Sequence, residues 1–166
     1  LAIDSLQESL TKGQIDLAIT IPQFLPPNIP YTTLFHESYR LVTSRESKVM
    51  RIGSVTELNE FEHIIVSPAR SNLKGSSQAW FDKHNIRRNI VASIPSFSLL
   101  EQYMSKTDVL AFVPSKMLPL NNLKELPIEP LPPGFEVVAA WHPKVQQDPL
   151  YQWLISKLKE ISRELS

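Results

Sequence analysis

The chain has 166 residues, 42% of them hydrophobic and 20% charged, which is the composition of a globular protein with room for one domain or two small lobes. Its 17 Lys and Arg residues balance 17 Asp and Glu residues, and this zero formal charge argues against nucleic-acid binding by this segment alone. Because cysteine is absent, disulfides, thiolate catalysis and cysteine-based zinc sites are excluded, and a cytoplasmic location is expected.

The first pair of elements is a short helix-to-strand connection in the segment LTKGQIDLAIT, residues 10–20. Apolar residues recur at helical spacing before and within it, at Leu1, Ile3, Leu6 and Leu10. Gly13 stands where a left-handed C-cap would end the helix, and the apolar run 15–19 predicts a buried strand of a parallel sheet. Asp16 lies within this run and needs a hydrogen-bond donor to offset its desolvation. Thr20, at the strand's carboxyl end, is a candidate ligand contact.

Strands alternate with helices through the rest of the chain. The prolines of residues 22–30 predict a stiff, extended connection, and residues 31–44 predict strand with a break near Glu37 and Ser38. Further strands are predicted at residues 64–66, 90–94, 109–113 and 135–141. The proline-rich residues 123–134 predict an edge strand or a loop. This alternation predicts an α/β domain with mainly parallel strands.

Polar side chains mark where the helices should begin. Ser54 and Glu57 have the spacing of a capping box and predict a short helix. Ser76 or Ser77 can cap the next helix, and Ser96 can cap the one after. The dipeptide Asp148-Pro149 predicts the start of a C-terminal helix.

No catalytic, nucleotide or metal motif is evident. The chain lacks GxGxxG, P-loop and GxSxG patterns, and it has only four glycines. Its histidines lie far apart without metal-ligand spacing, at His36, His63, His84 and His142. We therefore expect no enzyme activity, no cofactor and no metal. An enzyme with a two-lobed shape is a remaining possibility for which no residue can be nominated.

Small polar residues gather instead at the carboxyl ends of predicted strands. They are Thr20, Ser67, Arg70, Ser71 and Ser96, together with the turn after Val113. Ser96 could cap its helix while turning backbone N–H groups toward a carboxylate ligand, and Arg70 could add a charged pair. The alternatives stay open: Ser96 as a plain N-cap, Thr20 and Ser67 as strand ends, Arg70 as a solvated charge, and Phe97 as a core residue.

Three segments together resemble the effector-binding domain of LysR-type transcriptional regulators. They are LTKGQIDLAI at 10–19, TDVLAFVPSKM at 107–117 and WHPKVQQDPLYQWL at 141–154. The first is similar to the family's helix-to-strand connection that leads into the effector cleft. The second is similar to the strand and proline that close the cleft from the other lobe. The third is typical of the branch that contains nodulation activators and regulators of aromatic degradation.

The resemblance implies a two-lobed α/β fold like that of the type 2 periplasmic binding proteins. Lobe I would comprise residues 1–66 plus 143–166, and lobe II residues 67–142. Lobe I would be shortened at its N-terminus, because family members begin with a strand, a helix and a second strand before the segment that matches Leu1. Carried over position by position, effector contacts would be Thr20, Ile21, Ser67, Pro68, Arg70, Ser96, Phe97, Val113 and Pro114, with Trp141 and His142 near the return crossing between lobes.

The resemblance further implies a sensory domain that catalyses nothing. A small-molecule effector, expected to be a small organic or aromatic acid, would bind between the lobes. A winged helix-turn-helix preceding Leu1 would contact DNA, and the full-length protein would be a homodimer or homotetramer without a membrane segment. The alternative is an extracytoplasmic solute-binding protein of a transporter, which shares the fold. A signal peptide upstream of Leu1 would favour the transporter, and a helix-turn-helix would favour the regulator.

Overall fold

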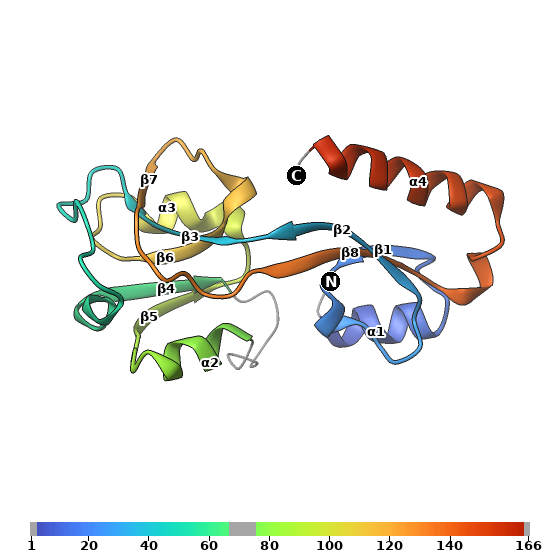
Figure 1. Cartoon of the computed structure of the whole chain (residues 1–166), viewed down its shortest axis with the longest axis horizontal. Coiled ribbons are helices and arrows are strands. Elements are labelled where there is room, and N and C mark those ends of the chain that lie inside the picture. The colour runs from blue at the N-terminus through green and yellow to red at the C-terminus, as the bar shows by residue number, and fades with distance from the viewer. Residues whose placement is uncertain (1–2, 67–75, 165–166) are drawn as a thin grey trace. The chain divides into compact units, whose positions relative to one another are not determined.

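The computed structural model describes residues 3–66 and 76–164. In it the chain forms two compact units (Figure 1). Unit 1 comprises Leu1–Glu37 and Gly134–Ser166, and unit 2 comprises Ser38–Pro133. The chain therefore passes between the units twice, after Glu37 and after Pro133. The strand break predicted near Glu37 and Ser38 is the first of these crossings.

These boundaries differ from the expected lobes of residues 1–66 plus 143–166 and 67–142. Residues 38–66 fall in unit 2 because β3 (Tyr39–Ser44) pairs there with β6 (Ala111–Pro114). Residues 134–142 fall in unit 1 because β8 (Phe135–Trp141) is the central strand of the unit 1 sheet. Strand pairing between segments that are far apart in the sequence decides to which unit a segment belongs. The local composition does not indicate this pairing.

The sheet of unit 1 has three strands, with β8 between β1 (Leu17–Thr20) and β2 (Tyr31–Glu37). Both pairings are antiparallel, with Leu17 opposite Trp141 and Tyr31 opposite Ala140. The parallel pairing predicted for β1 is therefore wrong. A helix-to-strand connection leaves the direction of the neighbouring strand open, and here that neighbour returns from the far end of the sequence.

Two helices complete unit 1. Helix α1 (Ile3–Thr11) ends as predicted, because Gly13 has a φ of +64° and the N–H groups of Gly13 and Gln14 donate to carbonyls of the last turn. Helix α4 (Pro149–Glu164) begins directly after Asp148. Asp148 Oδ1 accepts a hydrogen bond from the Leu150 N–H at 2.8 Å, which confirms the predicted cap. The proline-rich connection holds one 3-10 turn, Pro22–Phe24.

Unit 2 contains two groups of strands joined side by side. In the first, β3 lies between β6 and β7 (Leu123–Leu126), and both pairings are antiparallel. In the second, β4 (Glu62–Val66) and β5 (Asn89–Ile94) are parallel, as the α/β alternation predicts. Backbone hydrogen bonds between β4 and Leu110 join the groups. The prolines after residue 126 accord with the position of β7 at the edge of its group.

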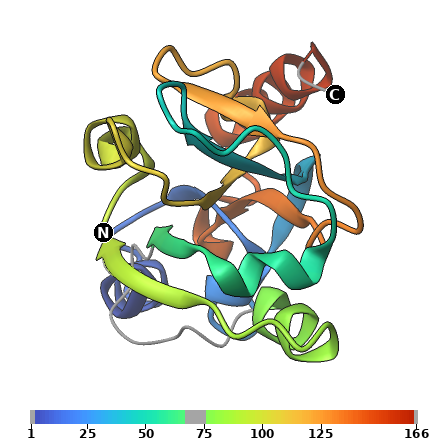
Figure 2. The same cartoon turned by 90° about the vertical axis from the view of Figure 1, so that its left-hand side faces the viewer.

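The strands of unit 2 bury side chains on both faces. Leu41 and Val42 are adjacent in β3 and enter different apolar clusters, because successive side chains of a strand point to opposite faces. Helix α2 (Ser76–Lys83) contributes Trp80 and Phe81 to the first cluster. Helix α3 (Leu100–Met104) contributes to the second, so the two helices cover opposite faces (Figures 1 and 2).

The capping box predicted at Ser54 is only half formed. A 3-10 helix, Val55–Glu60, follows Ser54, but the Ser54 hydroxyl bonds the Thr56 hydroxyl and caps no backbone N–H. The Glu57 carboxylate reaches back and accepts from the Gly53 N–H at 2.9 Å. This short helix carries Leu58, which is fully buried.

We predict that Leu41→Ala lowers the free energy of unfolding of unit 2 by about 3 kcal/mol, because Leu41 is fully buried between packed neighbours and its removal leaves a cavity. The control Met50→Ala removes a side chain that is 75% exposed and should cost less than about 0.5 kcal/mol. Urea denaturation followed by circular dichroism compares the two. Equal costs would contradict the placement of Leu41 in the core.

Candidate functional site

The site residues predicted in unit 1 lie at opposite ends of β1. Strand β1 ends at Thr20, which is paired with Val138 in the middle of β8, and Ile21 follows it. Trp141 is paired with Leu17 at the other end of β1, and the N–H of His142 donates to the Asp16 carbonyl at 2.9 Å. The return crossing precedes β8, roughly 20 Å of strand away from Trp141. The expected position of Trp141 and His142 near this crossing is therefore wrong.

Two of the segments that carry the family resemblance meet at this end of unit 1. The Lys144 ammonium lies 3.0 Å from Asp16 Oδ1 and donates to the Gly13 carbonyl at 2.8 Å. Hydrogen bonds from Lys144 and then Tyr151 are the main causes that hold the pKa of Asp16 below its ordinary value. The donor that Asp16 was expected to need is thus Lys144. A cation at the carboxyl end of α1 also suits the helix dipole, so this cluster ties α1 to the segment before α4.

The site residues predicted in unit 2 have mainly structural contacts. Ser96 is an N-cap, as predicted, and its Oγ accepts from the Ser98 N–H at 3.2 Å. Phe97 packs against the apolar cluster that contains Val113. Pro114 is paired with Tyr39 across β3 and β6. The remaining predicted residues, Ser67, Pro68 and Arg70, lie outside the described residues.

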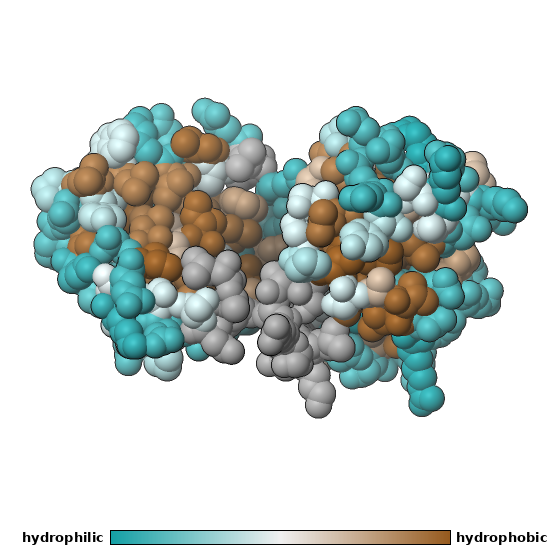
Figure 3. Space-filling view, turned by 180° about the vertical axis from the view of Figure 1, so that it is seen from behind, coloured by the Kyte–Doolittle hydropathy of each residue, from teal (hydrophilic) through white to brown (hydrophobic). Residues whose placement is uncertain are grey.

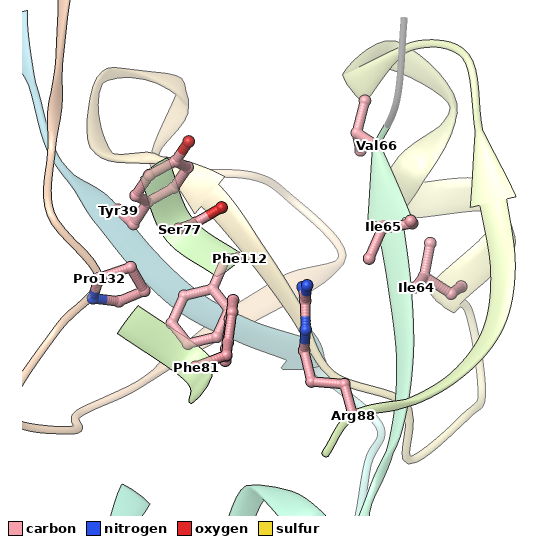
Figure 4. Close-up of a pocket in the computed structure, with 9 residues that line it drawn as sticks. All are labelled: Tyr39, Ile64, Ile65, Val66, Ser77, Phe81, Arg88, Phe112 and Pro132. Carbon is pink, nitrogen blue, oxygen red and sulfur yellow. The ribbon is translucent and has the colours of Figure 1, made fainter. Parts of the chain in front are cut away.

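A hollow of about 440 Å³, which includes open solvent at its mouth, lies within unit 2 between α2 and the strands β4 and β6 (Figure 4). We call it the α2 pocket. It is lined by Tyr39, Ile64, Ile65, Val66, Ser77, Phe81, Arg88, Phe112 and Pro132. Without the open solvent its volume is about 100 Å³, which is small for a ligand pocket and limits any occupant to a small molecule. Most of its lining residues are apolar or aromatic.

The α2 pocket contains one charged side chain, Arg88. The Arg88 guanidinium carbon lies 3.7 Å from the centre of the Phe81 ring, which is a cation–π contact. Burial lowers the pKa of Arg88, since a low dielectric disfavours the charged form. No ion pair among the described residues includes Arg88, and its hydrogen bond to Gln78 Oε1 is long, at 3.5 Å. The pocket therefore holds a half-buried positive charge with weak compensation.

A second hollow, of about 840 Å³ including open solvent, lies in unit 1. It is lined by Pro22, Gln23, His36, Glu37, Gly134, Phe135 and Glu136. His36 Nε2 lies 3.8 Å from Glu136 Oε1, on exposed side chains. It is open to solvent and most of its lining residues are polar or charged, so the mainly apolar α2 pocket is the better candidate. Within the described residues, no group of His, Asp or Glu could hold a metal ion.

Unit 1 also exposes large apolar side chains (Figure 3). They are Ile19, Tyr31, Leu150, Trp153 and Ile161. Single exposed apolar residues are common on proteins, and an apolar face by itself does not identify a partner. We assign no site to these residues.

Sequence reasoning missed the residues of the α2 pocket, Arg88 above all. Its nine lining residues come from β3, β4, α2, β6 and two connections, so no motif joins them. Arg88 follows another arginine, and only Arg88 is partly buried. No local pattern distinguishes the two.

The sequence profile of the LysR substrate binding domain matches residues 3–163. The chain belongs to the LysR substrate-binding domain family. It is 28% identical to nodulation protein D 1 of Rhizobium tropici, over 96% of this chain and 54% of that protein. It is 25% identical to the HTH-type transcriptional activator NahR of Pseudomonas putida, over 90% of this chain and 51% of that protein. The chain spans about half the length of the curated relatives it matches.

Solved structures of LysR regulators share the fold. The regulatory domain of MexT from Pseudomonas aeruginosa superposes with a TM-score of 0.77 at 21% identity, over 93% of this chain and 78% of that one. Full-length CbnR complexed with its target DNA gives a TM-score of 0.75 at 15% identity, over 98% of this chain and 58% of that one. These matches confirm the expected two-lobed α/β fold of the type 2 periplasmic binding proteins.

The family match identifies this chain as an effector-binding regulatory domain of the LysR-type transcriptional regulators. The relatives described above are regulators, and none of them supports the transporter alternative. The family consists of transcriptional regulators, which are not enzymes. No helix in the described ranges is long and apolar enough to cross a membrane.

We predict that Asp16→Asn makes the free energy of unfolding less dependent on pH under acidic conditions. Because the pKa of Asp16 is lower in the folded chain than in the unfolded one, its stabilising effect is present above about pH 4 and is lost as the pH falls below it. Urea denaturation between pH 3 and pH 7 should show the wild-type advantage over Asp16→Asn shrinking toward pH 3.

Lys144→Met should act like Asp16→Asn, because it removes the other half of the same ion pair. Glu46→Gln, on an exposed residue, is the control for loss of one carboxylate. A wild-type advantage that is the same at every pH would contradict the assigned role of the Asp16–Lys144 pair.

Proposed function

We propose that this chain is the sensory half of a longer LysR-type regulator, in which binding of a small organic acid changes the DNA binding of the whole protein. The observation that carries the proposal is the family match across residues 3–163, in a chain that covers about half of its relatives. One protein of the same fold, CbnR, has been crystallised at full length with its target DNA.

The DNA contacts would be made by a segment outside this chain. The chain has 17 basic and 17 acidic residues, so it has no net charge with which to attract the phosphate backbone. The winged helix-turn-helix implied by the family would supply those contacts. A protein that acts on chromosomal DNA would work in the cytoplasm, and we propose a homodimer or homotetramer as its working form.

Signal transmission would use the two chain crossings. The chain crosses between unit 1 and unit 2 after Glu37 and after Pro133. A ligand that binds one arrangement of the units more tightly than another shifts the population toward that arrangement. The regulatory domain of CcmR from Synechocystis, which matches this chain with a TM-score of 0.75 at 14% identity, over 97% of this chain and 80% of that one, was solved in complex with 2-PG. That complex supports a small molecule as the signal.

We predict that DNA binding requires the longer protein. A duplex selected from a random library with the longer protein should bind it at 150 mM salt, and residues 1–166 alone should bind that duplex at least about 100-fold more weakly in fluorescence anisotropy. The folded state of the shorter chain is checked by circular dichroism.

The effector arm of the same experiment adds small carboxylic acids to the longer protein on its selected duplex. At least one acid should change the affinity or the shape of the complex in a mobility-shift assay. Equal DNA affinity of residues 1–166 and the longer protein would overturn the assignment of the DNA contacts, and indifference to every acid tested would overturn the proposed effector class.

A further inference from the structure

The α2 pocket combines a guanidinium with aromatic and aliphatic walls. In Figure 4 the Arg88 guanidinium points into the space between Phe112 and Ile65. One of its faces lies on the Phe81 ring, at 3.7 Å from the ring centre, so its N–H groups point away from the ring, and only Nη2 makes a long hydrogen bond to Gln78 within the described part of the chain. The Phe81 and Phe112 rings meet edge to face at 5.7 Å, so the apolar wall is packed and preformed.

Among the described residues, the pocket holds no anionic partner for the charge of Arg88. The other eight lining residues are apolar or carry hydroxyls, and residues 67–75, which follow β4, include no Asp or Glu. Arg88 also influences His63, whose pKa is lowered first by burial and then by the Arg88 charge. A partly buried cation that lacks an anionic neighbour costs free energy unless an anion joins it.

We propose that the α2 pocket, wholly within unit 2, binds the carboxylate of a small monocarboxylic acid, with Arg88 as its charged contact. The carboxylate accepts two N–H bonds from the guanidinium edge, a geometry that suits a planar fork. The apolar body of the acid lies against Phe112, Ile65 and Val66. This inference rests on the proposed function, because it gives the effector domain a ligand class and a position.

The single cation sets the charge of the ligand. A phosphate group carries close to two negative charges at neutral pH and usually needs several donors. The α2 pocket offers one guanidinium with the hydroxyl-bearing residues Tyr39 and Ser77, which fits one carboxylate better. A bound acid would also bridge α2, β4 and the segment before β5, so it would stabilise unit 2 as a whole.

Isothermal titration of residues 1–166 tests the proposal with benzoate as the probe and benzamide as its neutral isostere. The wild type should bind benzoate at least about 10-fold more tightly than benzamide, because only benzoate pairs with the guanidinium. Arg88→Met keeps the apolar stem on Phe81 and should weaken benzoate about 10- to 100-fold while leaving benzamide unchanged.

Arg87→Met is the matched control, since Arg87 is the adjacent exposed arginine. Its backbone N–H donates to Asn59 Oδ1 at 2.6 Å, a bond that the substitution keeps. Arg87→Met should bind benzoate like the wild type. If Arg88→Met does not fold by circular dichroism, Arg88→Lys replaces it; the charge is kept, but the planar fork is lost, so binding should still weaken severalfold.

Three results would overturn the proposal: no heat with benzoate or with cyclohexanecarboxylate, equal affinity for benzoate and benzamide, or unchanged benzoate affinity in the Arg88 variants. The proposed function is tested separately by DNA binding. A longer protein that carries Arg88→Met and still responds to acids on DNA would refute the α2 pocket as the site and leave the regulatory role standing.

Discussion

The central position of β8 is the constraint on which the architecture depends. Without β8, strands β1 and β2 share no neighbour, because the sheet order of unit 1 is β1-β8-β2. Its residues Val138, Ala139 and Ala140 are fully buried, and two of them are small enough for close packing from both sides. The chain must therefore leave unit 1, build unit 2 and return at Gly134 before unit 1 is complete. Unit 2 is therefore an insertion between the two segments of unit 1.

The segment LTKGQIDLAIT that first indicated the family has a structural purpose in unit 1. Gly13 suits this position because of its φ of +64°, and a Cβ there would lie 3.0 Å from Lys144 Nζ. Lys144 then closes the cluster from the segment WHPK by reaching both Asp16 and the Gly13 carbonyl. Two of the segments that carry the resemblance are thus far apart in the sequence and in contact in unit 1, and their contact stabilises this unit.

Hydrophobic alternation and capping residues predicted the helices and strands well. They could not predict which strands pair with one another. Phe135–Trp141 and the start of α4 at Asp148-Pro149 follow from alternation and capping chemistry, and both are as predicted. The antiparallel direction of β1 depends on β8, which no residue near β1 indicates. The resemblance located Trp141 and His142 by their order in the chain, whereas a seven-residue strand carries them away from the crossing. The sequence did not predict Arg88 as a site residue, because its partial burial depends on the packing of α2 over β4.

The α2 pocket links the family assignment to chemistry, since a regulatory domain needs a ligand whose binding energy can bias its conformation. The most direct measurement is a titration of ¹⁵N-labelled residues 1–166 with benzoate, followed through the arginine Nε–H and backbone amide resonances. The account predicts saturable shifts of the Arg88 Nε–H and of the amides of Ile64, Ile65 and Val66. Shifts confined to unit 1, or none at saturating benzoate, would contradict it.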